Sequence, residues 1–116
     1  MMKRYTLALD LKDDPAIIAE YEHWHRAGNG WPEIKQSIEG AGISNMEIYR
    51  TGNRLFMIME TNEHFSFEKK SEMDAVNPKV QEWEQLMSKF QQPLPWAREG
   101  EKWMMMDKIF GLHESR

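Results

Sequence analysis

The stretch that most constrains the fold lies in the middle of the chain, where two strand-like segments flank a tight turn. Residues 46–50 and 55–61 are rich in strand-favouring side chains, and residues 51–54 between them contain a glycine and an asparagine, which tolerate a positive φ. This pattern predicts an antiparallel hairpin. Because residues 55–59 are apolar without interruption, we expect their strand to be central or covered on both faces.

The segments before this hairpin predict one strand and two helices. Residues 5–11 alternate between apolar and polar side chains, the period of a half-buried strand. A helix is predicted over about residues 15–25, with Asp14 as its N-cap and a proline in its first turn. A second helix, which also begins with a proline, is predicted over about residues 32–41.

The last third of the chain adds helical segments and one more strand. Residues 63–76 are helical or irregular, and residues 78–90 repeat apolar side chains at a spacing of three to four. Residues 91–100 contain two prolines and predict a loop, and residues 102–110 predict a last strand. We therefore expect residues 1–116 to form one α+β domain with a four-stranded antiparallel sheet and helices on one face.

The apolar pattern of the strands and the composition of the chain indicate which partners and which compartment to expect. The other sheet face is also apolar, so a second copy of the chain is the simplest cover and a homodimer is predicted. The net charge of −4 argues against a nucleic-acid partner. The chain has no cysteine and no apolar run long enough to span a membrane. We expect a cytoplasmic protein that binds a small molecule.

Residues 21–33 hold the side chains best suited to chemistry. Tyr21 and His25 are four positions apart, so on a helix they project from one face about one turn from each other. An imidazole titrates near neutral pH, and beside a phenol it can handle protons. Trp31 follows after a glycine-rich break. The alternative is that the Tyr21–His25 pair only packs or lies at the surface.

Stronger motifs are absent from the sequence, which limits the reaction classes. It contains no phosphate-binding loop, dinucleotide-binding motif, zinc-protease motif or nucleophile elbow. His23 and His25 would diverge on a helix, so no metal site and no cofactor are expected. Trp83 lies on an apolar helical stripe and suits either the core or a pocket. Aromatic faces with a few hydrogen-bonding groups favour a sugar as the ligand.

The sequence resembles the L-rhamnose mutarotase family, small proteins that interconvert the anomers of 6-deoxyhexoses. The resemblance covers about residues 3–110. It rests on these stretches: Glu20, Tyr21 and His25; Trp31-Pro32-Glu33; Gly42-Ile43-Ser44-Asn45 with Ile48-Tyr49; Asn53-Arg54-Leu55-Phe56 with Glu60; and Trp83 with Met87. It implies a ferredoxin-like, dimeric α+β barrel and an isomerase of the aldose 1-epimerase type.

The resemblance also implies roles for individual residues. His25 matches the catalytic histidine, Tyr21 a sugar-contacting tyrosine, and Trp83 the first tryptophan of a pair that lines the pocket. With Trp31 and Asn45 from the matching stretches, Tyr21 and Trp83 form the expected sugar-binding set. No cofactor and no metal are implied.

Three departures from the family pattern lie near the expected pocket. The second tryptophan of the pair is Glu84, the tyrosine expected after Asn45 is Met46, and the loop at residues 26–30 is longer. L-fucose is therefore a candidate substrate beside L-rhamnose. Two other functions stay open. One is a sugar-binding or sensor domain without catalysis, and the other is haem or oxygen chemistry on the same barrel architecture.

Overall fold

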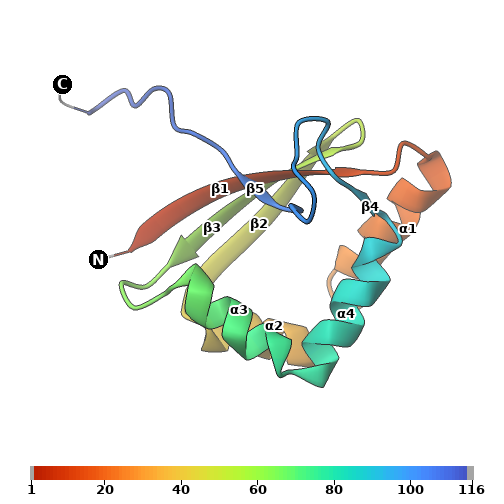
Figure 1. The fold of residues 1–116 in the computed structure, drawn as a ribbon, viewed down its shortest axis with the longest axis horizontal. Helices are drawn as coiled ribbons and strands as arrows, with labels where there is room; N and C mark the ends of the chain where they lie inside the picture. The colour runs from red at the N-terminus through yellow and green to blue at the C-terminus, as the bar shows by residue number, and fades with distance from the viewer. Residues whose placement is uncertain (1, 115–116) are drawn as a thin grey trace.

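The computed structural model describes residues 2–114, with four helices on one face of an antiparallel sheet (Figure 1). In chain order the elements are β1 (Lys3–Leu11), α1 (Pro15–His25), α2 (Pro32–Gly40), β2 (Ile43–Thr51), β3 (Arg54–Thr61), α3 (Phe67–Ala75), α4 (Pro78–Ser88), β4 (Gln91–Gln92) and β5 (Met104–Met105). The predicted α+β class and the hairpin are confirmed. The strand order is β2-β3-β1-β4, so β3 is central as its apolar sequence predicts.

The fourth strand position is the one part of the sheet where the sequence prediction is wrong. Instead of one strand over residues 102–110, two short strands share the free edge of β1. β4 pairs with Asp10 and Leu11, and β5 pairs with Leu7 and Ala8. Continuing β5 backwards would place Lys102 opposite Asp10, a position that β4 already occupies. The described part of the sheet therefore has five strands rather than four.

The helix starts follow from their capping residues. The Asp14 carboxylate accepts hydrogen bonds from the backbone N–H groups of Ala16 and Ile17, at 2.8 and 3.2 Å. Asn77 caps α4 in the same way, and α1, α2 and α4 each have a proline in the first turn. Gly42 turns the chain from α2 into β2 with φ +97°, where a Cβ atom would meet the Asn62 side chain at 2.8 Å.

The core lies between the sheet and the helices, in two clusters along β3. One end joins Leu7, Met57 and Met59 to Phe65 and the side of α2. The other end is formed by α1 and α4 packing on the sheet through these residues: Leu11, Tyr21, Leu55, Met87 and Phe90. Tyr21 is thus a core residue, and it fixes the last turn of α1 against the sheet.

The opposite sheet face carries two ion pairs of very different burial. Arg54 donates from Nε and Nη2 to the two carboxylate oxygens of Asp10, at 2.7 and 3.2 Å, and the Asp10 side chain is only 3% exposed. Arg4 and Glu60, on the same two strands, are 3.3 Å apart, and this pair is open to solvent on the Arg4 side, whose side chain is 69% exposed against 25% for Glu60. A buried carboxylate depends on its partner, whereas an exposed pair contributes little.

Replacing Arg54 by methionine should therefore destabilise the fold far more than replacing Arg4. Arg54→Met leaves a buried carboxylate without its cation, and we expect the free energy of unfolding to fall by about 3 kcal/mol. Arg4→Met, the matched control, should cost less than about 1 kcal/mol. Urea unfolding at one fixed protein concentration measures both. Equal losses in the two variants would contradict the assignment.

Candidate active site

His25 lies at the end of α1 and is held by the preceding turn of that helix. Its Nδ1–H donates to the carbonyl oxygen of Tyr21 at 2.8 Å, and its ring stacks on the Tyr21 ring with centroids 4.2 Å apart and an interplanar angle of 30°. Because a carbonyl only accepts, this bond requires the proton on Nδ1. Nε2 is left as an acceptor without a partner among residues 2–114.

Burial sets the protonation states of this pair. Loss of solvation lowers the pKa of His25 below 6.5, and the hydrogen bond to the Tyr21 carbonyl opposes this only in part. The imidazole is therefore neutral at neutral pH. Burial also raises the pKa of Tyr21 to about 12, against a smaller opposing effect of its hydrogen bond with Gln91. The phenol thus remains protonated and serves as a donor rather than as a base.

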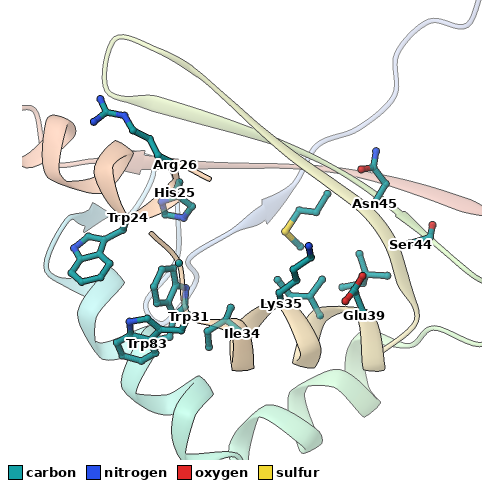
Figure 2. Close-up of a pocket in the computed structure, with 14 residues that line it drawn as sticks. Trp24, His25, Arg26, Trp31, Ile34, Lys35, Glu39, Ser44, Asn45 and Trp83 are labelled. Carbon is teal, nitrogen blue, oxygen red and sulfur yellow. The ribbon is translucent and has the colours of Figure 1, made fainter. Parts of the chain in front are cut away.

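Three indole rings surround the exposed side of this pair. The Trp83 ring on α4 lies edge to face with the rings of His25, Trp31 and Trp24, with centroids 5.8, 5.3 and 6.3 Å apart. Figure 2 shows the labelled tryptophans gathered below and beside His25. Such faces suit the CH surface of a pyranose ring. This cluster joins α1, the start of α2 and α4.

A cavity of about 430 Å³ between the sheet and the helices reaches this cluster. Its walls are mostly apolar. The polar side chains that line it are Tyr21, His25, Ser37, Lys70, Asp74, Glu84 and Gln91. Its volume falls within the range of about 300–1,000 Å³ typical of small-molecule sites. A neighbouring hollow of about 370 Å³, drawn in Figure 2, opens between α1, α2 and β2 and shares His25 and Trp83 with the cavity.

The structure brings together four of the five residues singled out in the sequence. Tyr21, His25 and Trp83 line the cavity, and Trp31 lies against Trp83 at its mouth. Asn45 lines the far end of the neighbouring hollow, and its carboxamide donates to Glu60 at 3.3 Å (Figure 2). Its register places it on the sheet face opposite the helices.

The cavity also contains polar residues that sequence reasoning missed. Lys70 and Asp74 of α3 form an ion pair at 2.6 Å with both side chains mostly buried. Gln91 reaches the Tyr21 phenol, and Glu84 lines the same wall as Trp83. The spacing of Lys70 and Asp74, four apart on a helix, is their one sequence signal, and it equally fits a surface pair.

Three further findings concern metal binding, His23 and membrane-spanning segments. Within residues 2–114, no three side chains among His, Cys, Asp and Glu come close enough together to bind a metal ion. His23 lies against the Trp24 ring, with centroids 5.8 Å apart. No helix in this part of the chain has the length and apolar character needed to cross a membrane.

Fold and site together define a small α+β domain with a cavity that can hold a small neutral ligand beside the neutral imidazole of His25. The sequence profile of the L-rhamnose mutarotase family matches residues 4–112. The chain is 46% identical to the L-fucose mutarotase of Xanthomonas campestris over 114 residues, which cover 98% of this chain and 91% of the relative. The chain therefore belongs to the L-rhamnose mutarotase family, whose members are isomerases of sugar anomers.

Two more distant relatives extend this comparison. A UPF0734 protein of Dictyostelium discoideum is 38% identical over 117 residues, covering 95% of this chain and 90% of the relative. The crystal structure of an L-rhamnose mutarotase from Formosa agariphila has a TM-score of 0.67 and 20% identity, covering 95% of this chain and 98% of that one. At this identity the likeness establishes the fold.

The environment of His25 leads to a direct prediction for its titration. Burial favours the neutral ring, so the midpoint for protonation of His25 should lie below pH 6.5. Proton NMR of the imidazole C–H signals over a pH series measures it, with His25→Gln identifying the resonance. A midpoint at or above 6.5 would mean that the ring is solvated or faces a negative charge.

Proposed function

We propose that the protein is a mutarotase that interconverts the α and β anomers of a 6-deoxyhexose, with L-fucose as the preferred sugar. The observation that carries the proposal is the His25–Tyr21 arrangement. It presents a neutral imidazole with a free Nε2 at an aromatic cavity of monosaccharide-binding character. The identity of 46% to an L-fucose mutarotase supports the choice of sugar. The replacement of a family tryptophan by Glu84 also favours a sugar other than L-rhamnose.

In this mechanism His25 acts as the general base and then as the general acid. Nε2 takes the proton of the anomeric hydroxyl while the bond between C1 and the ring oxygen breaks. The ring oxygen gains a proton, and the sugar becomes the open-chain aldehyde. After rotation about C1–C2, the same hydroxyl oxygen attacks the other face of the carbonyl and returns its proton to the group that supplied it, while His25 gives its proton back to the former carbonyl oxygen. Atoms and charges balance without a cofactor.

The second proton is the one delivered to the ring oxygen. With a pKa of about 12, the Tyr21 phenol is protonated at neutral pH and can donate toward the charge that develops there. A water molecule is the other possible source. Either way Tyr21 positions His25, because its carbonyl binds Nδ1 and its ring supports the imidazole.

Aromatic side chains supply the binding surface for the sugar. Trp83 and Trp31 would stack on its apolar face and exclude water from His25, which strengthens hydrogen bonds in the site. Asn45, on the other sheet face, is proposed to act indirectly. Its bond to Glu60 lies beside the bulge at the start of β2, which shapes the far end of the neighbouring hollow.

The decisive test is the anomer exchange rate at equilibrium. Saturation-transfer proton NMR on the anomeric signals of L-fucose and L-rhamnose should show acceleration by the wild type. His25→Gln should reduce that acceleration by about 100- to 10,000-fold, the usual contribution of one positioned acid–base group. Exchange at the spontaneous rate for both sugars with wild-type protein would reject the proposal.

Tyr21→Phe is the matched variant for this experiment. It keeps the backbone carbonyl and the ring that hold His25 and removes only the hydroxyl. If Tyr21 supplies the second proton, turnover falls while the His25 titration stays unchanged. Full turnover in Tyr21→Phe would assign that proton to water and leave the tyrosine a positioning role.

We also propose that the protein is a homodimer that joins the outer sheet faces of two copies. The helices leave that face uncovered, and apolar side chains of β3 and β5 line it, among them Phe56, Ile58 and Met104. Beyond β5 the chain leaves the sheet (Figure 1), and Ile109 and Phe110 are 89% and 73% exposed. Large apolar side chains so exposed favour burial against another copy.

An acidic substitution at the centre of this face should separate the copies. We expect Ile58→Asp to sediment as a monomer at micromolar concentration, because a carboxylate there would be desolvated in the interface. Val76→Asp is the control, since Val76 is 82% exposed and lies at the end of α3. Analytical ultracentrifugation of the wild type and of both variants measures the oligomeric state. A wild-type monomer, or a dimer that survives Ile58→Asp, would refute the arrangement.

A further inference from the structure

A second group of polar side chains lines the cavity, and these residues are far from His25 in the sequence. Asp74 and Lys70 project from α3 into the cavity that Tyr21, His25 and Trp83 also line. A larger hollow of about 640 Å³ beside α3 and α4 shares the same pair and the Trp83 wall. Figure 1 shows α3 beside α4. Because residues of both α1 and α3 line the cavity, a ligand in it would meet groups from both helices.

The Asp74 carboxylate has one oxygen occupied and one without a partner. Oδ2 accepts from Lys70 Nζ at 2.6 Å. Oδ1 is buried, and no donor reaches it within residues 2–114. The backbone carbonyl of Asp74 accepts from Gln81 Nε2 at 2.8 Å, so the end of α3 is fixed around the side chain. A buried carboxylate oxygen normally has a hydrogen-bond donor, and an unpaired one on a residue that lines a cavity favours a donor supplied by a ligand.

A purely structural role accounts less well for this pair. Lysine and aspartate four positions apart on a helix stabilise it slightly when they lie in water. Here the side chains are 22% and 15% exposed, so both have lost most of their hydration. An ion pair kept largely buried gains little stability over apolar residues of similar size. Its placement in the cavity therefore favours a binding role.

We propose that Asp74 and Lys70 bind the sugar hydroxyls on the side of the pyranose ring away from the anomeric carbon. A small rotation of the Asp74 side chain turns the buried Oδ1 toward the cavity, where it accepts a hydrogen bond from one hydroxyl, and Lys70 Nζ donates to the oxygen of the neighbouring hydroxyl. This inference rests on the proposed mutarotase function, since it places the anomeric carbon at His25. A carboxylate and an ammonium side by side match the donor and acceptor of a vicinal diol.

Asp74→Asn and Lys70→Met test the pair, with Glu72→Gln as the matched control. Glu72 is exposed on the same helix and lines neither the cavity nor the hollows described above. We expect Asp74→Asn to weaken L-fucose binding, measured by calorimetry, by about 10- to 100-fold, as for loss of a hydrogen bond to a charged group. KM should rise by a similar factor with little change in kcat, because His25 is untouched.

The sugar itself provides a test that does not depend on how the variants fold. Wild-type protein should bind 3-deoxy- or 4-deoxy-L-fucose about 10- to 100-fold more weakly than L-fucose. Asp74→Asn should show almost no further loss with the same deoxy sugar. Should Asp74→Asn not fold, the Lys70→Met variant and the wild-type deoxy-sugar comparison decide the question.

The outcomes separate this inference from the function on which it rests. Unchanged L-fucose affinity in Asp74→Asn, or full wild-type affinity for both deoxy sugars, overturns the subsite. Equal weakening by Glu72→Gln would also overturn it, because the effect would then be a general charge effect. A wild type that binds L-fucose without accelerating exchange rejects the mutarotase function, while the binding measurements still decide the subsite. Failure to bind either 6-deoxyhexose overturns both.

Discussion

The structure depends on the pairing of β3 with β1 on one side and β2 on the other. β3 supplies Leu55, Met57 and Met59 to the helix face, and all four helices lie on that face. Tyr21 packs into one of the two core clusters, so its backbone carbonyl and ring are held in place by the sheet. The orientation of His25 follows from Tyr21. The position of the imidazole is thus a consequence of core packing rather than of a loop.

The local order of the chain was accessible from its sequence. Capping by Asp14, the prolines that begin the helices and the turn before β3 are short-range effects, and the corresponding elements form where they were expected. The same holds for Tyr21 and His25, because their stacking needs only helical spacing. Spacing also left open whether the pair was merely packed. Its place at the wall of a cavity required the tertiary structure.

Features that depend on competition between distant segments could not be predicted from the sequence. Residues 102–110 have a strand-like pattern, but β4 occupies part of the β1 edge that they would use. Neither segment reveals this competition by itself. The burial of Asp74 could not be predicted from the sequence either, because its surroundings are assembled from α3, α4 and the segment that follows α4. A charged residue on a polar helix predicts solvent exposure, and only the packing of α3 on α4 reverses that prediction.

The two faces of the sheet separate two tasks. Tyr21, His25 and Trp83, together with Lys70 and Asp74, reach the cavity from the helix side of one chain. In the proposed dimer the second copy would cover the other face and would not need to complete this set. On each strand, the residues that face the helices would then be constrained by the active site, and the residues that face outward would be constrained by the dimer interface. Because neighbouring side chains on β3 point to opposite faces, Met57 can shape the cavity while Ile58 serves the interface.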